Sequence, residues 1–173
     1  MLPGPGGSPG LSHVITLLVA AAAVIWAAAL PAAAYALALP DAGSAVHAFA
    51  VAVYGFGSAI CHQRDERSFH LFAERLPVCA RCTGLYLGSA LVAIPYLFSA
   101  LRIRDSASAV DPARARRLLG VAALPMAISI VYEWTTGRLP SNGLRAATGI
   151  ILGGMVARLI LEGLASSHRP RQK

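Results

Sequence analysis

The stretch that decides the fold is VITLLVAAAAVIWAAALPAAAYALAL, residues 14–39, in which no side chain is charged. A helix rises about 1.5 Å per residue, so a helix of this length exceeds the roughly 30 Å hydrocarbon core of a bilayer. Pro31 interrupts the run, but membrane helices tolerate proline better than soluble ones do. A cleavable signal peptide is the rival interpretation, and it needs a cationic beginning and a shorter apolar run. We therefore expect a retained first transmembrane helix.

The composition of the whole chain agrees with a membrane setting. Of its 173 residues 56% are hydrophobic and 13% are charged, with a mean hydropathy of +0.60, whereas about a quarter of a soluble domain is charged. Three further apolar runs of spanning length lie at 83–101, 118–136 and 146–164. Residues 44–60 are at the lower limit for spanning and form either an interfacial segment or a fifth span. The sequence thus predicts an all-α polytopic membrane helix bundle of about four spans in a lipid bilayer.

The basic residues give the expected partners and orientation. The formal net charge is +7, but the arginines flank the apolar runs, so we expect no nucleic-acid partner. The basic segment 102–117 and the basic C-terminal tail share one side, which we expect to be the cytoplasmic side of a bacterial cytoplasmic membrane. The cysteine-containing segment then lies outside, together with 137–145. The expected division is a flexible tail 1–12, an N-terminal membrane region 13–60, a core 61–164 and a basic tail 165–173.

The polar segment CHQRDERSFHLFAERLPVCARC, residues 61–82, contains all three cysteines of the chain. The Cys79-x-x-Cys82 spacing lets two thiolates bind one tetrahedral metal ion. Cys61 supplies a third sulfur, and either His70 or His62 completes a Cys3His set. The first hypothesis is therefore a zinc site at the membrane surface.

Thiol–disulfide exchange is the alternative chemistry for the same sulfurs. Cys82 is expected at the beginning of the 83–101 helix, where unsatisfied N–H groups, the helix dipole and the neighbouring Arg81 stabilise a thiolate. Cys79 and Cys82 would then exchange a disulfide, assisted by Cys61, with a quinone as electron acceptor. A static disulfide with one leftover thiol is the third possibility. The spacing alone does not separate these alternatives.

The residues between the cysteines predict a short surface helix from Glu66 to Leu76, capped by Asp65. Glu66, His70 and Glu74 would then form a polar stripe at i, i+4 and i+8. His70 would either bind the metal or pair with these neighbouring carboxylates.

Glu133 lies inside the apolar run IVYEWTT, where an unpaired ionisable side chain is costly. Arg145, Arg138 and Arg81 are its expected partners from the same side of the membrane. The pair could simply fix the helix register, or Glu133 could serve as a metal ligand or a proton-handling carboxylate. Both interpretations stay open.

Two pairs of glycines predict close helix contacts. Gly84-xxx-Gly88 and Gly149-xxx-Gly153 each place small residues on one helix face, which lets backbones approach closely. We expect contacts within the bundle rather than a dimer interface.

Four blocks of the sequence together resemble a known family. CHQRDERSFHLF, LPVCARCTGLYLG, LPMAISIVYEW and NGLRAATGIILGG, within residues 61–154, resemble a family of small bacterial and archaeal membrane proteins known only as a domain of unknown function. The resemblance implies no activity. It implies that residues 1–60 are a variable addition and that the Cys, His, carboxylate and Arg positions form one shared site. The family usually has Asp where this chain has Glu133, a difference that keeps the charge.

The predicted architecture is also similar to that of quinone-linked disulfide-forming oxidoreductases, in which Cys-x-x-Cys begins a helix on the outer face. That similarity is one of architecture only. Those enzymes use a second cysteine pair to relay electrons, whereas this chain adds only Cys61.

Overall fold

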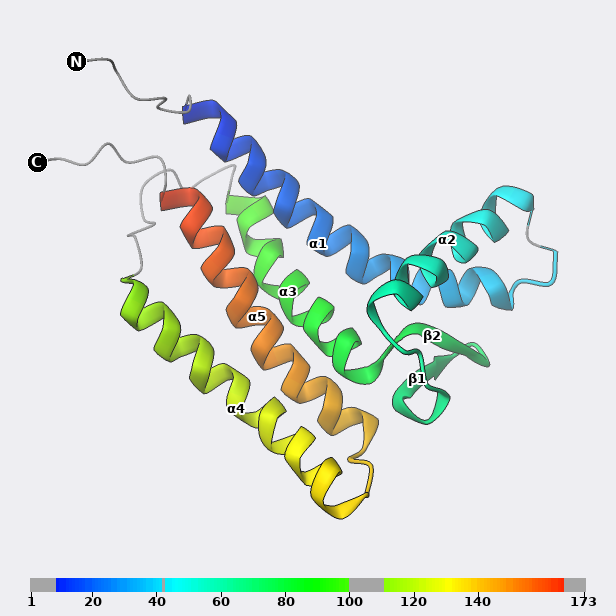
Figure 1. The fold of residues 1–173 in the computed structure, drawn as a ribbon. Helices are drawn as coiled ribbons and strands as arrows, with labels where there is room; N and C mark the ends of the chain where they lie inside the picture. The colour runs from blue at the N-terminus through cyan, green and yellow to red at the C-terminus, as the bar shows by residue number, and fades with distance from the viewer. Residues whose placement is uncertain (1–8, 42, 100–110, 167–173) are drawn as a thin grey trace, which may run out of the picture.

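The computed structural model describes residues 9–41, 43–99 and 111–166. These residues form five α-helices, one turn of 3-10 helix and a two-stranded hairpin (Figure 1). The elements are α1 (Pro9–Ala38), α2 (Ser44–Ile60), η1 (Asp65–Arg67), β1 (Ser68–Leu71), β2 (Glu74–Cys79), α3 (Ala80–Ser99), α4 (Pro112–Thr136) and α5 (Asn142–Ser166). Helices α1, α3, α4 and α5 are long and apolar enough to cross a membrane. The predicted class, a helical membrane bundle with about four spans, is confirmed.

The helices begin earlier than the apolar runs predict. α4 begins at Pro112 because the Asp111 side chain accepts a hydrogen bond from the Arg114 amide at 3.1 Å, and proline is favoured in a first turn. α3 begins at Ala80, so Cys82 lies within its first turn. Residues 9–12 belong to α1 and not to the expected tail. The rest of that tail, the basic residues 102–104 and the basic residues 169–173 lie outside the described residues.

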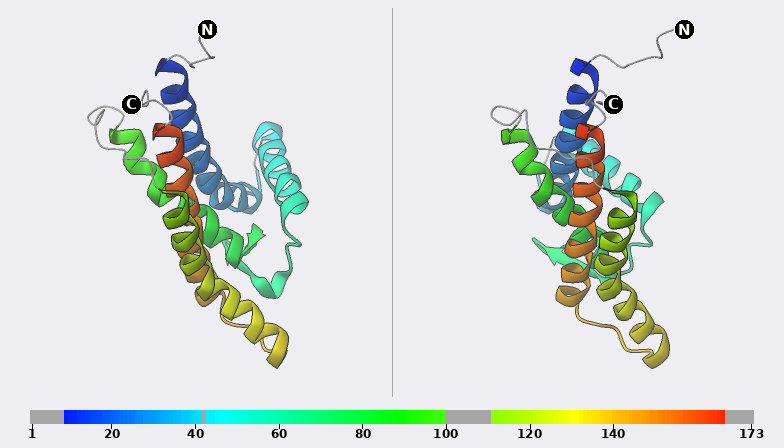
Figure 2. Two further views of the ribbon diagram at one scale, coloured as in Figure 1. Left: turned by 60° about the vertical axis from the view of Figure 1, so that its left-hand side comes forward. Right: turned by 90° about the vertical axis from the view of Figure 1, so that its left-hand side faces the viewer.

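Glycines allow the close contact between α3 and α5. A Cβ atom at Gly84 would collide with the carbonyl oxygen of Ala146, and one at Gly153 would collide with the carbonyl oxygen of Leu85. Gly88 and Gly149 are equally crowded by the opposing backbone. The prediction that these glycines pack helices within the bundle is confirmed, and α3 and α5 lie side by side in Figures 1 and 2.

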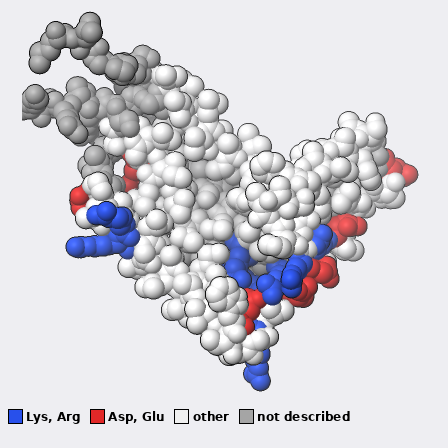
Figure 3. All heavy atoms as spheres, viewed as in Figure 1, with Lys and Arg blue, Asp and Glu red and all other residues white. Residues whose placement is uncertain are grey.

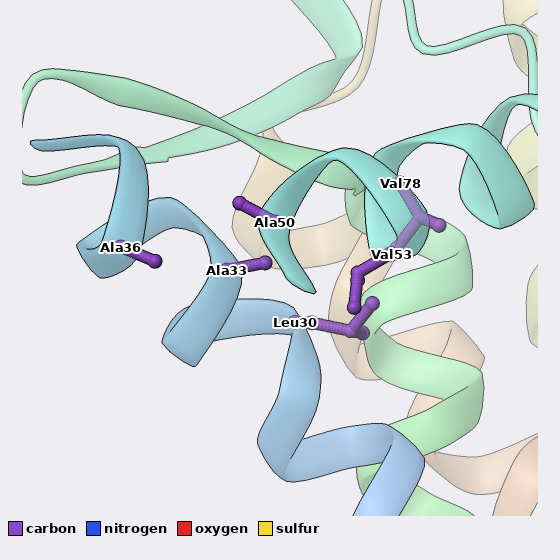
Figure 4. Packing of buried hydrophobic residues seen from close by; sticks show 6 residues of the cluster. All are labelled: Leu30, Ala33, Ala36, Ala50, Val53 and Val78. Carbon is purple, nitrogen blue, oxygen red and sulfur yellow. The ribbon is translucent and has the colours of Figure 1, made fainter. Parts of the chain in front are cut away.

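Helix α2 folds back against the end of α1 and, in Figure 1, runs across the direction of α1 and α3. Its 17 residues make it shorter than the four candidate spans. Small and branched apolar side chains from α1, α2 and β2 pack together beside it: Leu30, Ala33, Ala36, Ala50, Val53 and Val78 (Figure 4). Of the two expectations for residues 44–60, this arrangement favours an interfacial helix.

The predicted surface helix from Glu66 to Leu76 is wrong, because an antiparallel hairpin occupies these residues. Arg64, not Asp65, precedes the single turn η1, and the polar stripe does not form. Phe72 and Ala73 form the hairpin turn with φ angles of 57° and 66°, values that favour glycine or asparagine. The register shifts between Ser68 and His70, on the strand opposite Pro77, which has no N–H to continue the ladder.

Charged side chains gather around the hairpin and at the opposite end of the bundle, with uncharged surface between them (Figure 3). At the hairpin end, the Asn142 side-chain amide donates a hydrogen bond to the carbonyl oxygen of Ser68 at 2.9 Å. The loop between α4 and α5 therefore shares the side of the cysteine segment, as the sequence predicted.

Candidate functional site

Three cysteine sulfurs meet where the hairpin joins α3. Cys61 follows α2, Cys79 ends β2 and Cys82 lies in the first turn of α3. Their Sγ atoms all lie within 4.8 Å of one another, and each cysteine is partly buried as a free thiol. The backbone amide of Cys79 also donates to the Cys61 Sγ at 3.2 Å. We call Cys61, Cys79 and Cys82 the cysteine cluster.

The surroundings of Cys79 favour its thiolate form. A hydrogen bond from the Cys82 thiol is the main reason that the pKa of Cys79 is lowered to about 5, while partial burial acts in the opposite direction. Backbone amides of Arg81 and Cys82, at the beginning of α3, add to this effect. The sequence assigned the stabilised thiolate to Cys82. The structure favours it at Cys79 instead, mainly because the Cys82 thiol donates a hydrogen bond to the Cys79 sulfur.

Gln63 and Gly57 bring Cys61 to the other two sulfurs. The Gln63 side-chain amide donates to the carbonyl oxygens of Tyr54 at 2.9 Å and Pro77 at 2.7 Å, so it bridges α2 and β2. A Cβ atom at Gly57 would collide with the same Pro77 carbonyl. The Tyr54 hydroxyl also donates to the carbonyl oxygen of Arg75. These contacts between α2 and β2 hold Cys61 and Cys79, the two ends of the intervening segment, close together.

Neither expected histidine belongs to the group of candidate ligands that the described residues form. His70 is half exposed, and its Nε2 lies 2.9 Å from the Asp65 carboxylate. His70 therefore pairs with a carboxylate, as one of its two expectations had it, but the partner is Asp65 and not the expected Glu66 or Glu74. His62 is exposed in the loop after Cys61.

A second cluster, of charged side chains, includes Arg81 from the first turn of α3. Glu133 of α4 accepts from Arg67 at 2.8 Å through one carboxylate oxygen, and from Arg81 at 2.8 Å and Arg145 at 3.0 Å through the other. Arg81 also donates to the Ser129 hydroxyl at 3.3 Å. The Arg145 side chain is 1% exposed and that of Glu133 is 8% exposed. We call Arg67, Arg81, Arg145 and Glu133 the arginine cluster.

The expected pairing of Glu133 with Arg81 and Arg145 is confirmed, and the third expected partner is wrong. Arg138 follows the end of α4 at Gly137 and is exposed. Arg67, which belongs to η1, pairs with Glu133 instead. Sequence reasoning missed Arg67 and Gln63. Both lie in the polar segment, but nothing in their spacing indicates which distant element each contacts.

Two archaeal proteins are similar to the chain in sequence. The chain is 34% identical over 111 residues to an uncharacterized protein of Methanocaldococcus jannaschii, a match that covers 64% of this chain and 67% of that protein. It is also 34% identical over 94 residues to an uncharacterized protein of Methanothermobacter thermautotrophicus, covering 54% and 78% respectively. No solved structure matches the chain significantly.

The sequence model of a family described as "Predicted membrane protein (DUF2085)" matches residues 61–159. This range begins at Cys61 and contains every residue of the cysteine and arginine clusters, while α1 and α2 lie outside it. Both of these relatives come from archaea, which the expected family range includes, and the expected bacterial membrane stays a prediction. Because the family model matches more than half of the chain, the chain belongs to the DUF2085 family of predicted membrane proteins.

Proposed function

We propose that this membrane protein binds one thiophilic metal ion, most suitably Zn²⁺, through Cys61, Cys79 and Cys82. The observation that carries the proposal is the approach of three free sulfurs from separate elements to within 4.8 Å of one another. Sulfurs that bind one zinc ion at about 2.3 Å each lie close together in this manner. A thiolate is already favoured at Cys79, and thiolates are the form that binds metal.

Three sulfurs leave one position of a tetrahedral ion for a fourth ligand. His62 directly follows Cys61 and is the candidate histidine without a carboxylate partner among the described residues, whereas His70 has Asp65. If His62 binds, the shell is closed, as in structural zinc sites. If water binds instead, the ion keeps an open position, as in catalytic zinc sites.

Elemental analysis of the protein purified in detergent, beside a count of its free thiols, tests the proposal. We expect about one equivalent of metal, lost in Cys79→Ser because a hydroxyl is a poor substitute for a thiolate. His70→Ala and His47→Ala serve as matched controls and should retain the metal, while His62→Ala decides the fourth ligand. Metal-free wild-type protein, or equal metal content in Cys79→Ser, would contradict the proposal.

Thiol–disulfide exchange is the second candidate, and the low pKa of Cys79 favours it. In this case a Cys79–Cys82 disulfide accepts two electrons and two protons from a substrate dithiol, and a quinone reoxidises the reduced pair. The chain contains only three cysteines, so a second pair for relaying electrons is missing. Purification of metal-free protein with an oxidised Cys79–Cys82 pair would favour this candidate over the metal site.

We propose further that the cysteine cluster faces the extracytoplasmic side. The proposal is supported by the expected cytoplasmic location of the basic segment 102–117, which is separated from the hairpin by α3. A membrane-impermeant thiol reagent, applied to intact cells after metal removal and reduction, should label Cys79. Labelling only after lysis would reverse the orientation and weaken the redox candidate, which needs an oxidising compartment.

A further inference from the structure

The arginine cluster carries more positive charge than its own carboxylate balances. Three guanidinium groups converge on Glu133, so Glu133 supplies the only carboxylate within hydrogen-bond distance of them among the described residues. Two further groups offset part of the excess: Glu66, half exposed and 3.8 Å from the Nε of Arg67, and the Cys79 thiolate, which acts on Arg145. Like charges at such short separation repel strongly in surroundings of low dielectric constant. A structural ion pair needs only one arginine, so the excess of arginines at this position calls for a further explanation.

The unsatisfied hydrogen-bond donors of the arginine cluster also indicate that a negatively charged acceptor is missing. The Nε atoms of Arg67, Arg81 and Arg145 are buried and have no hydrogen-bond partner among the described residues. Arg145 is 1% exposed, so water does not readily satisfy its Nε. Buried polar atoms are satisfied in the great majority of cases, and one left without a partner costs free energy. Three such donors around one carboxylate are typical of a site that lacks an acceptor.

The chemistry and position of the cluster indicate which acceptor fits. Guanidinium groups match the oxygens of phosphate with paired hydrogen bonds, and a phosphate carries enough negative charge to offset the excess. The Arg67 side chain is one-third exposed and forms the accessible edge of the cluster. This edge lies beside the hairpin at the ends of the candidate spans, the level at which lipid headgroups meet a membrane protein.

We propose that Arg67, Arg81 and Arg145 form a binding site for a phosphate group, supplied either by a soluble phosphate compound or by a lipid headgroup. Glu133 holds the three side chains in place and limits their excess charge. The site does not require metal at the cysteine cluster. Binding should therefore persist in Cys79→Ser, so failure of the metal proposal and failure of this one can be distinguished.

Titration of the full chain in maltoside detergent, in buffer free of phosphate and sulfate, tests the site. One arm adds inorganic phosphate and follows heat and melting temperature. The other arm adds phosphatidylglycerol to delipidated protein, with diacylglycerol as the lipid that lacks phosphate. We expect one of the two phosphate probes to bind and raise the melting temperature. Binding of inorganic phosphate identifies a soluble source, and binding of phosphatidylglycerol alone identifies a headgroup.

Arg67→Gln is the decisive variant, because Arg67 is the most exposed arginine of the cluster and Glu133 retains two partners without it. Loss of a charge-assisted hydrogen bond should weaken binding roughly tenfold or more. Arg67→Lys should bind with intermediate affinity, since it keeps the charge but loses the planar fork. Arg64→Gln removes an exposed charge from the same loop and should bind like wild type. Failure of both probes, or equal binding by Arg67→Gln and Arg64→Gln, overturns the proposal.

Discussion

The cysteine cluster and the arginine cluster share the start of α3 but are held by different parts of the molecule. Cys61 and Cys82 pack against the apolar residues of α1, α2 and β2. Arg81, which lies between Cys79 and Cys82 in the sequence, instead extends toward Glu133 of α4. The sulfurs are partly buried and come from the loop after α2, the end of β2 and the first turn of α3. The charges of the arginine cluster are more deeply buried and tie η1, α3, α4 and α5 together.

The comparison suggests different roles for the two clusters. The fold should survive the loss of the cysteine cluster, whereas it requires the arginine cluster. Removing a sulfur takes away a ligand but leaves no buried charge behind. Removing Glu133 leaves three guanidinium groups facing one another. We therefore expect substitutions in the two clusters to act on different properties, metal content in the first and stability in the second.

Glu133→Gln should have the largest effect on stability. Breaking a buried ion pair by removing one partner costs about 3–5 kcal/mol, because the remaining charge is stranded. A second substitution of Arg81 should rescue only part of this loss, since two arginines would still lack a carboxylate. Thermal unfolding in detergent measures both effects.

The matched control for Glu133 is Glu162, whose carboxylate pairs with Arg158 at 2.7 Å in an i,i+4 arrangement where Arg158 is 60% exposed. Glu162→Gln should cost less than about 1 kcal/mol. Equal losses in the two variants, or full rescue by the Arg81 substitution, would show that the cluster is not a four-membered unit.

The reactivity of Cys79 should separate it from the other two sulfurs. With a pKa of about 5, Cys79 is mostly thiolate at pH 6.5, where an ordinary thiol is about 1% ionised. Alkylation of metal-free, reduced protein should therefore modify Cys79 first, by at least an order of magnitude in rate, with a rate that falls as the pH drops through 5. The lowered pKa of Cys79 also stabilises the folded, reduced protein at neutral pH, and this contribution declines as the pH falls from the ordinary thiol pKa to about 5.

Peptide mapping after brief iodoacetamide treatment identifies the modified cysteine, and Cys79→Ser serves as the control. Equal labelling of all three cysteines at pH 6.5 would contradict the assignment of the thiolate.

Gly153→Ala should affect the two clusters unequally. The added methyl group would collide with the Leu85 backbone and move α3 from α5, at a cost of about 1–3 kcal/mol. Because Arg145 lies on α5 and the sulfurs do not, the arginine cluster should be disturbed while metal content is retained. Gly120→Ala, where the added methyl group has open space, should be neutral or slightly stabilising. A loss of metal in Gly153→Ala without a loss of stability would show that the contact between α3 and α5 supports the cysteine cluster rather than the arginine cluster.

The sequence predicted what depends on local pattern. Apolar runs gave the four spans, the glycine spacing gave the α3–α5 contact, and the Cys-x-x-Cys motif marked the cysteine cluster. The sequence did not predict the hairpin or the contacts that it makes. The turn consists of Phe72 and Ala73, without the glycine or asparagine that signals such a turn. The i, i+4 spacing of polar residues then favoured a helix. With the wrong element, the contact of Arg67 with Glu133 could not be predicted.

Ala73→Gly should have the smallest effect and should act on the hairpin that both clusters share. Ala73 has a φ of 66°, a conformation that costs about 1–2 kcal/mol for a residue with a Cβ atom. Glycine relieves this cost but gains entropy in the unfolded chain, so we expect a net stabilisation of about 0.5–1 kcal/mol.

Ala123→Gly, inside α4, should instead destabilise by up to about 1 kcal/mol. Metal content and phosphate binding should be unchanged, because the turn lies at the far end of the hairpin from Cys79 and Arg67. A lower melting temperature for Ala73→Gly would mean that the turn is not the strained element described here.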